Sequence, residues 1–480
     1  MNTTNTFEKE LTFQANRRKS SVKFINIVND LFYDKSIELV LFRNSLINKN
    51  VSEILSLHEY AGEFVQKPIS VFDVLEIAEA IQSLDLPPSK LDIGKLTYEY
   101  HVEKSSNPIK FVTDKLKGAK KTSGIQPKDV VLYGFGRIGR LLARELAAKT
   151  GKGDQLRLRA IVTRGEITQT VLEKRASLLK NDSVHADFNG TVSIDLEKKA
   201  LIINNMTIHM ISANQPEDID YTFYGIDDAL IIDNTGAFRD KEALSRHLKA
   251  KGASKVLLTA PGKGVPNIVH GVNQNDYDTS KVDIYSAASC TTNAITPILD
   301  AIDESYGVNH GHLETIHAYT NDQNLVDNMH KKYRRGRAAA LNMVITETGA
   351  GKAVSKALPN LEGKLTSSAI RVPVPNGSLA ILNLTLEKET TKDELNAKIR
   401  KYALEGNLVE QIKYSIDNEL VSSDIVGSSA PAIYDSHATI VEGKSNNAIV
   451  YIWYDNEYGY SHQVLRLAKY IADVRRFTYY

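Results

Sequence analysis

The apolar positions divide the chain into two regions with different periodicities. Over residues 1 to about 114 they recur at helical spacing, most clearly in the run from Val71 to Ile81. Two prolines, Pro87 and Pro88, would end any helix that extends this far. The pattern therefore predicts an all-helical N-terminal extension made of several helices.

The pattern changes after a basic stretch, Lys115–Pro127, whose glycines and final proline are typical of a linker. From Asp129 onward, short apolar strands alternate with helical segments, which indicates an α/β domain. The chain has 480 residues, which is enough for about two to four domains.

A glycine-rich turn joins the first strand of this second region to a helix. The strand, Val130–Tyr133, leads into Gly-Phe-Gly-Arg-Ile-Gly at 134–139, and a helical segment follows from Arg140. Glycines there permit a tight turn and a close approach of the backbone to a pyrophosphate, whose charge the helix N-terminus stabilises. A purely structural glycine turn is the alternative, but the strand–turn–helix context favours a dinucleotide site.

The next strand is Leu156–Val162. In a dinucleotide-binding fold this strand usually ends near an acidic residue that binds the ribose hydroxyls of the cofactor. Here it runs into Thr163, Arg164 and Gly165, so Arg164 is a candidate for binding the 2′-phosphate of NADP. Glu166 leaves NAD open, and an exposed arginine without a role in binding is an equal alternative. The sequence thus predicts NAD or NADP as the cofactor.

Cys290 is the only cysteine of the chain, and it lies between a predicted strand, 283–288, and a predicted helix, 291–302. At a helix N-terminus, free backbone N–H groups and the helix dipole favour a thiolate. His317 follows 27 residues later at the end of a strand-like segment. A lone cysteine is more often a small buried hydrophobic residue, but a thiol near a base is the arrangement of covalent catalysis.

The composition narrows the classes of function. The net charge of +1, from 59 basic and 58 acidic residues, gives no case for binding to nucleic acid or to a membrane surface. One cysteine allows no internal disulfide, the apolar runs are too short to span a bilayer, and the first residues lack an apolar signal core. We therefore expect a cytoplasmic protein. No histidine spacing is typical of a metal site, so we expect no metal.

Five motifs, taken together, resemble those of the phosphorylating glyceraldehyde-3-phosphate dehydrogenases, from about residue 129 to the C-terminus. In chain order they are Gly-Phe-Gly-Arg-Ile-Gly-Arg at 134–140, Ser-Cys-Thr-Thr-Asn at 289–293, His-Ala-Tyr-Thr at 317–320, Arg-Val-Pro at 371–373, and Trp-Tyr-Asp-Asn-Glu-Tyr-Gly-Tyr-Ser at 453–461. The first 120 or so residues lie outside the family's usual pattern.

The resemblance implies an α/β fold in which a Rossmann NAD(P)-binding domain is combined with an α+β catalytic domain. We expect the helical extension and linker over residues 1–126, the Rossmann domain over 127–289 with its completion by 461–480, and the catalytic domain over 290–460. The segment 319–342 resembles the family's S-shaped loop, which implies a homotetramer.

The resemblance also implies an activity, the oxidation and phosphorylation of glyceraldehyde 3-phosphate to 1,3-bisphosphoglycerate in glycolysis or gluconeogenesis. Cys290 would carry the thiohemiacetal and thioester, and His317 would act as the base. The residues expected to bind the cofactor are Gly134, Gly136, Arg137, Ile138, Gly139, Arg164, Thr235, Gly236, Asn456 and Tyr460. Those expected to bind inorganic phosphate are Ser289, Thr291, Thr348 and Gly349, and those for the phosphate of the substrate are Thr320 and Arg371.

Asp322 departs from the family's commonest pattern, which has a threonine there, although some members share the Thr-x-Asp-Gln sequence. A carboxylate beside a phosphate repels it unless the carboxylate is paired.

The S-shaped loop also contains a basic cluster, made of Arg334, Arg335 and Arg337. We expect these arginines to form ion pairs, either exposed to solvent or between subunits. The alternative is that they contribute to a positive electrostatic field over the active site.

Two other functions stay open. Erythrose-4-phosphate dehydrogenase is a relative with the same cysteine and histidine, although the retained pair Thr348-Gly349 favours the phosphorylating enzyme. The extension also permits a regulatory or binding protein on the same fold, but the complete set of catalytic residues argues against a loss of catalysis.

Overall fold

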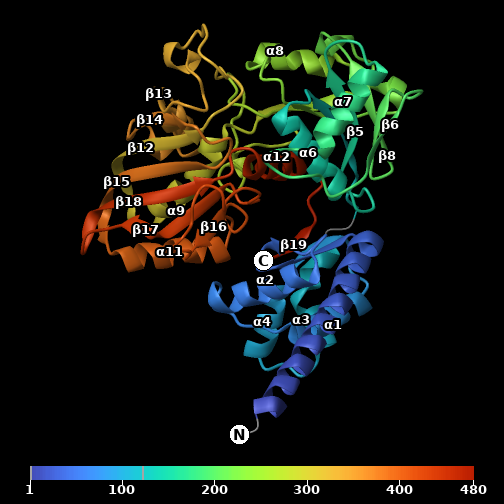
Figure 1. Ribbon diagram of the computed structural model, residues 1–480, viewed down its shortest axis with the longest axis vertical. Helices are drawn as coiled ribbons and strands as arrows, with labels where there is room; N and C mark the ends of the chain where they lie inside the picture. The colour runs from blue at the N-terminus through green and yellow to red at the C-terminus, as the bar shows by residue number, and fades with distance from the viewer. Residues whose placement is uncertain (1–2, 122–123) are drawn as a thin grey trace. The chain divides into compact units, whose positions relative to one another are not determined.

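The computed structural model describes residues 3–121 and 124–480, and these form two compact units (Figure 1). The first unit takes in the described residues up to 126 together with residues 151–155 and 474–480. The second unit contains residues 127–150 and 156–473. The last seven residues thus cluster with the first unit, whereas the sequence-based expectation places them in the Rossmann domain.

The first unit packs helices around a small sheet, so the prediction of an all-helical extension is wrong. Its helices are α1 (Thr3–Lys35), α2 (Val51–Glu63), α3 (Val71–Ser83), α4 (Ile93–Val102) and α5 (Pro108–Lys115). Its strands are β1 (Ile37–Leu41), β2 (Asn44–Ser45), β3 (Ser89–Asp92) and β19 (Phe477–Tyr479). They form a sheet in the order β19-β3-β1-β2. Strand β1 is buried along its whole length, and periodicity alone does not distinguish such a short apolar run from a buried helix.

The helix predicted around Val71–Ile81 is confirmed as α3. Ser70 caps its N-terminus in a capping box with Asp73, which satisfies backbone N–H groups that the helix itself leaves free. The predicted linker, Lys115–Pro127, begins at the last residue of α5 and contains a short 3-10 helix, Lys117–Lys121. Its residues 122 and 123 lie outside the described part of the chain.

The C-terminal residues complete the sheet of the first unit. Strand β19 runs parallel to β3, with Phe477 opposite Ser89 and Tyr479 opposite Leu91. The ammonium of Lys95 donates to the carbonyl oxygen of Tyr480. Because strands pair through backbone hydrogen bonds, the last residues of the chain satisfy an edge that β3 would otherwise leave open.

The second unit begins with a doubly wound sheet, as predicted. Its strands are β4 (Lys128–Tyr133), β5 (Leu156–Thr163), β6 (Val192–Asp195), β7 (Ala200–Ile203), β8 (Met206–Ser212), β9 (Ala229–Asp233), β10 (Ala253–Leu258) and β11 (Ile284–Ser286). The order is β11-β10-β9-β4-β5-β8-β7-β6, and the six strands from β11 to β8 are parallel. The helices of this part include α6 (Arg137–Ala148), α7 (Gln169–Lys180) and α8 (Lys241–Ser245).

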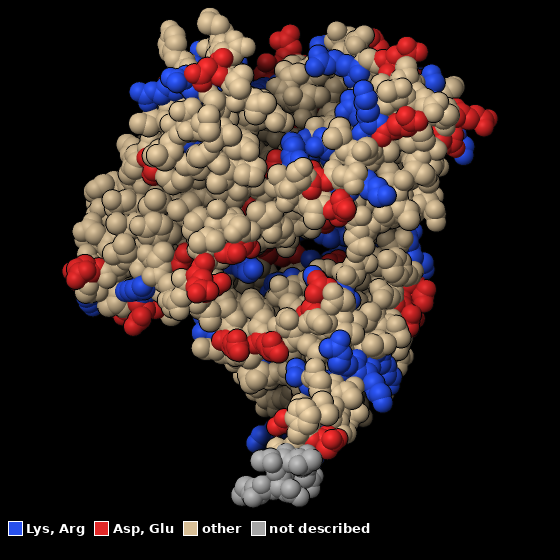
Figure 2. Space-filling view, viewed as in Figure 1, with Lys and Arg blue, Asp and Glu red and all other residues tan. Residues whose placement is uncertain are grey.

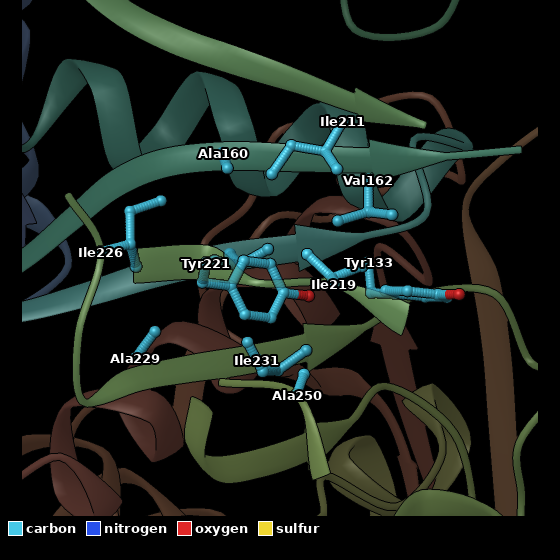
Figure 3. Close-up of a cluster of buried hydrophobic side chains, with 11 residues drawn as sticks. Tyr133, Ala160, Val162, Ile211, Ile219, Tyr221, Ile226, Ala229, Ile231 and Ala250 are labelled. Atoms are coloured by element: carbon cyan, nitrogen blue, oxygen red, sulfur yellow. The ribbon is translucent and has the colours of Figure 1, made fainter. Parts of the chain in front are cut away.

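One face of this sheet is covered by an apolar cluster (Figure 3). Side chains of β4, β5, β8 and β9, including Val131, Val162 and Ile231, pack with Tyr221 from the connection between β8 and β9. Tyr133, the last residue of β4, belongs to the same cluster. Burial of this apolar surface fixes the end of β4, from which the glycine-rich turn starts.

The remaining residues of the second unit form a mixed sheet with helices. Its strands are β12 (Val308–Ala318), β13 (Val344–Thr346), β14 (Leu365–Val372), β15 (Ser378–Thr390), β16 (Ile412–Ser415), β17 (Ala432–Ile440) and β18 (Ser445–Tyr454), in the order β13-β14-β12-β15-β18-β17-β16. Its helices are α9 (Cys290–Tyr306), α10 (Ala350–Ala357), α11 (Lys392–Leu404) and α12 (Tyr458–Ile471). Helix α12 packs against both α6 and α9 (Figure 1), so one helix fixes the two helices that begin at the glycine turn and at Cys290.

The surface carries both signs of charge. Figure 2 shows acidic and basic side chains interspersed over the face that it draws, in keeping with the near-zero net charge. No helix among the described residues has the length and apolar character needed to cross a membrane.

We predict that deletion of residues 477–480 loosens the first unit, because β3 loses its neighbour on one side. Amide hydrogen exchange in β3 should become at least about tenfold faster, as measured by mass spectrometry. Thr478→Ala is the matched control, since the Thr478 side chain is exposed and the backbone pairing stays. Unchanged exchange in β3 after the deletion would contradict this role of the C-terminal strand.

Candidate active site

Cys290 is the first residue of α9, which begins one residue before the predicted start at Thr291, so the expected position near a helix N-terminus is confirmed. Ser289 caps the helix, and its hydroxyl accepts the backbone N–H of Thr292 at 3.0 Å. The approach to the helix is strained, because Ala288 has a φ of 54°, in the left-handed region that alanine rarely adopts. Two hydrogen bonds hold it there: Ala288 N–H donates to the Ser286 hydroxyl at 3.0 Å, and the Tyr460 hydroxyl donates to the Ala288 carbonyl at 2.9 Å.

His317 lies near the end of β12, with its Nε2 3.5 Å from the sulfur of Cys290. The ring is oriented by its own backbone, since Nδ1 lies 2.7 Å from the carbonyl oxygen of Ala318. A carbonyl oxygen can only accept, so a hydrogen bond here requires the proton on Nδ1, and Nε2 is then an acceptor that faces the thiol. The structure thus brings the two predicted catalytic residues together, and with the proton on Nδ1 the Nε2 atom is placed to accept the proton of the thiol.

Arg371 places a positive charge beside this pair. It lies opposite His317 in the parallel pairing of β12 with β14. Its Nη1 donates to the Ala318 carbonyl at 2.8 Å and to the Thr320 hydroxyl at 3.3 Å. It also lies 2.9 Å from Nδ1 of His317, and because a guanidinium can only donate, this contact is a hydrogen bond only in the tautomer with the proton on Nε2. One guanidinium therefore contacts both the base and a residue predicted to bind the phosphate of the substrate.

Burial and the Arg371 charge set the protonation states. Burial, followed by the guanidinium, lowers the pKa of His317 to about 3, so the imidazole is neutral near pH 7. Burial raises the pKa of the Cys290 thiol, and the Arg371 charge and hydrogen bonds at the start of α9 act in the opposite direction. The cation beside the sulfur therefore offsets part of the cost of forming a thiolate in a buried site.

Asp322 is paired, which removes the expected conflict with a bound phosphate. Burial alone would raise the pKa of its carboxyl, but a hydrogen bond from Thr320 and the charge and hydrogen bond of Arg335 hold that pKa below its usual value. Arg335 also donates to the Thr346 hydroxyl at 3.2 Å. The sequence placed Arg335 in a basic cluster without assigning it this partner, and Arg337 of the same cluster pairs with Asp327.

The glycine-rich turn has the shape of a dinucleotide cradle. Gly134 has a φ of 100°, and a Cβ on Gly139 would lie 2.4 Å from the carbonyl oxygen of Gly134, so both positions require glycine. Gly136 precedes α6 without a side-chain cap, and a Cβ there would meet nothing within 4 Å. Free N–H groups and open space at this helix N-terminus fit a pyrophosphate.

Arg137 and Ile138 open α6, but the Arg137 side chain is engaged elsewhere. Its guanidinium bonds to both oxygens of Glu457 and to Asp182. Any hydrogen bond from Arg137 to a cofactor therefore comes from its backbone. Arg164 is exposed just after β5, where no hydrogen bond of its side chain is found among the described residues.

The turn at Thr235 and Gly236 is held by a buried aspartate at the end of β9. Asp233 accepts the N–H of Thr235 at 2.8 Å and its hydroxyl at 2.7 Å, and its other oxygen is 3.0 Å from Nε2 of His247. Both Asp233 and His247 are fully buried. Gly236 has a φ of 65°, which suits a tight turn at this end of the sheet.

The remaining candidates for cofactor and phosphate sites are helix caps or buried polar groups. The Thr348 hydroxyl accepts the N–H of Ala350 at 3.2 Å, at the start of α10, next to Gly349. The Thr291 hydroxyl is 3.1 Å from that of Tyr454. No hydrogen bond joins Thr348 or Gly349 to Cys290 or His317 in the part of the chain that the structure describes, although α10 packs against α9.

Asn456 is buried after β18, and its Oδ1 accepts a hydrogen bond from Ser378 at 2.8 Å. Sequence reasoning assigned no role to Ser378, because a serine at the start of a strand carries no local signal of its own. Tyr454 was missed as a partner of Thr291, although it lies in the motif at 453–461 that carries the family resemblance.

A Rossmann cradle together with a thiol–imidazole pair defines a class, the dinucleotide-dependent enzymes that react through a cysteine. The comparison with known proteins makes the assignment specific. The family model of the glyceraldehyde 3-phosphate dehydrogenase NAD binding domain matches residues 128–241, and that of the C-terminal domain matches residues 289–456. The chain belongs to the glyceraldehyde 3-phosphate dehydrogenase family.

Individual relatives agree with this membership. A Pseudomonas aeruginosa protein named glyceraldehyde-3-phosphate dehydrogenase-like protein is 48% identical over 457 residues, which cover 94% of this chain and 98% of the relative. The glyceraldehyde-3-phosphate dehydrogenases of Streptomyces coelicolor and Geobacillus stearothermophilus are each 40% identical, over 72% of this chain and 98% of their own length. The first of these similarities extends into the N-terminal unit, because 94% of the chain is more than the second unit contains.

We predict that Arg371→Gln slows alkylation of Cys290. Loss of the positive charge raises the pKa of the thiol, so the thiolate fraction near pH 7.5 falls by about tenfold for each pKa unit. The second-order rate with iodoacetamide should fall by roughly that factor, and it should recover as the pH is raised. The matched control is Arg337→Gln, which removes an exposed arginine paired with Asp327. An equal or faster rate in Arg371→Gln would contradict the electrostatic account.

Proposed function

We propose that this protein oxidises and phosphorylates glyceraldehyde 3-phosphate to 1,3-bisphosphoglycerate, with NAD or NADP as the cofactor. The observation that carries the proposal is the Cys290 sulfur at 3.5 Å from Nε2 of His317, whose Nδ1 lies 2.7 Å from the Ala318 carbonyl oxygen. This pair lies beside Arg371, in a family whose named members include glyceraldehyde-3-phosphate dehydrogenases.

The chemistry starts at the thiol. His317 Nε2 takes the proton of Cys290, and the thiolate adds to the aldehyde carbon, so that a C–S bond forms and the C=O π bond breaks. The imidazolium returns the proton to the oxygen, which becomes the hydroxyl of the thiohemiacetal. His317 then removes the hydroxyl proton as the C–H bond breaks, which leaves a thioester on Cys290. Bound NAD or NADP supplies the hydride acceptor for this oxidation. An oxygen of inorganic phosphate attacks the thioester carbon, and the Cys290 thiolate leaves as the acyl phosphate forms.

Two anion sites would serve this reaction. Thr320 and Arg371 would hold the phosphate of the substrate, because a guanidinium donates two hydrogen bonds to a phosphate. Arg335 supports this site indirectly by neutralising Asp322. The attacking phosphate would be held by Ser289, Thr291, Thr348 and Gly349. The donors would be their hydroxyl groups and the backbone N–H groups at the start of α10.

The cofactor would lie on the cradle of Gly134, Gly136 and Gly139, with the backbone of Arg137 and Ile138 at the pyrophosphate. Thr235 and Gly236 would line the same site, and Asn456 and Tyr460 would face the nicotinamide.

Arg164 would bind the 2′-phosphate of NADP. Its side chain is exposed just after β5 and makes no hydrogen bond to the described residues.

We further propose a homotetramer in the cytoplasm, assembled through the S-shaped loop. This loop and the strand after it carry apolar side chains that are largely exposed, among them Leu325, Met329, Tyr333 and Leu341, whose exposed fractions are 81%, 93%, 96% and 82%. Such a group of exposed apolar residues is typical of a surface that a partner covers.

The test is the formation of reduced cofactor from glyceraldehyde 3-phosphate, with NAD and NADP in parallel, with and without inorganic phosphate. We expect steady turnover that requires phosphate, and the better cofactor then decides the role of Arg164. Turnover that is independent of phosphate, or that occurs with erythrose 4-phosphate alone, would contradict the proposal. It would favour an erythrose-4-phosphate dehydrogenase, whose product is an acid. No turnover with either substrate in folded protein would favour a binding or regulatory role.

A further inference from the structure

One serine connects the catalytic strand to the segment that carries Asn456. Ser378 is the first residue of β15 and is fully buried. Its hydroxyl oxygen accepts the backbone N–H of Ala318 at 3.1 Å, and its proton goes to Oδ1 of Asn456 at 2.8 Å. Ala318 directly follows His317, so this hydroxyl lies between the general base and Asn456.

The hydrogen-bonding capacity of Ser378 fixes the orientation of the Asn456 amide. The Ala318 N–H can only donate, so it uses a lone pair of the serine oxygen and leaves the single hydroxyl proton for another acceptor. Oδ1 of Asn456 is that acceptor, and Nδ2 therefore points away from Ser378. No hydrogen bond of this Nδ2 is found within residues 3–121 and 124–480, so its two protons are available to a ligand.

The backbone around Asn456 is held by its neighbour, which limits the ways in which the amide can move. Asp455 is buried, and one of its oxygens accepts from the Asn376 side chain at 2.9 Å and from the N–H of Tyr458 at 2.7 Å. The other oxygen accepts the N–H of Gly427 at 2.8 Å. With the backbone fixed, the Ser378 hydroxyl controls the remaining freedom, which is the rotation of the Asn456 side chain.

We propose that Ser378 is a positioning residue for the nicotinamide half of the cofactor, because it aims the Nδ2 protons of Asn456 at the primary carboxamide of the nicotinamide ring. The proposal rests on the proposed function in so far as a nicotinamide dinucleotide is the ligand. A rotated amide would present an oxygen to the carbonyl of the carboxamide, and two acceptors repel each other. Because the same hydroxyl also holds Ala318, it ties the position of the ring to that of His317.

The test compares two ligands on the full-length protein. NAD carries the nicotinamide and ADP-ribose lacks it, so their dissociation constants, measured by isothermal titration calorimetry, separate the two halves of the site. We expect Ser378→Ala to weaken NAD binding by about tenfold, since one hydrogen bond of this kind contributes roughly that factor, and to change ADP-ribose binding by less than twofold. Ser378→Thr keeps a hydroxyl and should recover most of the loss for NAD.

One control variant and one double variant distinguish a specific effect of Ser378 from a general loss of stability. Ser436→Ala removes another buried hydroxyl of the same sheet, one that donates to the Ser415 carbonyl at 2.6 Å, and should leave both constants unchanged. Asn456→Ala should weaken NAD binding, and Ser378→Ala added to it should cause little further loss, because the two residues act through one contact.

Equal weakening of NAD and ADP-ribose by Ser378→Ala, no weakening of NAD, or additive effects in the double variant would each overturn the proposal. These outcomes are independent of the reaction. A wild-type protein that prefers NAD over ADP-ribose but does not oxidise glyceraldehyde 3-phosphate would contradict the proposed substrate and leave the role of Ser378 to be decided by the same binding constants.

Discussion

The hydrogen bond from Nδ1 of His317 to the carbonyl oxygen of Ala318 is the interaction on which the site depends. It favours the tautomer with the proton on Nδ1, in which Nε2 faces the Cys290 sulfur as an acceptor. The same carbonyl also accepts from Arg371, so the cation that favours the thiolate is held at the atom that orients the base. The fold supplies this geometry through the parallel pairing of β12 with β14, which sets His317 opposite Arg371.

The thiol is presented to the base by a strained and well-supported turn. Ala288 adopts a positive φ that costs about 1–3 kcal/mol in alanine, and the Ser286 and Tyr460 hydroxyls hold it in place. Tyr460 belongs to α12, the helix that also packs against α6 behind the glycine cradle. One helix therefore fixes the cradle and the nucleophile relative to each other, which a hydride transfer between a cofactor and a thiol adduct requires.

The sequence was informative where the signal was local and failed where partners came from far along the chain. The strand–glycine–helix pattern at 130–146 and the helix that starts near Cys290 were predicted correctly, because backbone geometry demands those residues. The all-helical extension was wrong because β1 is a short buried run and β19 arrives from the other end of the chain. The pairing of Asp322 with Arg335 and the role of Ser378 both depend on contacts that no local pattern reveals.

We propose that Cys290 carries the substrate through a thioester that His317 helps to form. The most direct measurement is intact-protein mass spectrometry after addition of glyceraldehyde 3-phosphate and oxidised cofactor in the absence of phosphate. We expect one acyl group on each chain, located on Cys290 by peptide mapping, released by inorganic phosphate and formed far more slowly in His317→Asn. A protein that turns over without an adduct on Cys290, or an adduct that forms equally fast without His317, would contradict it.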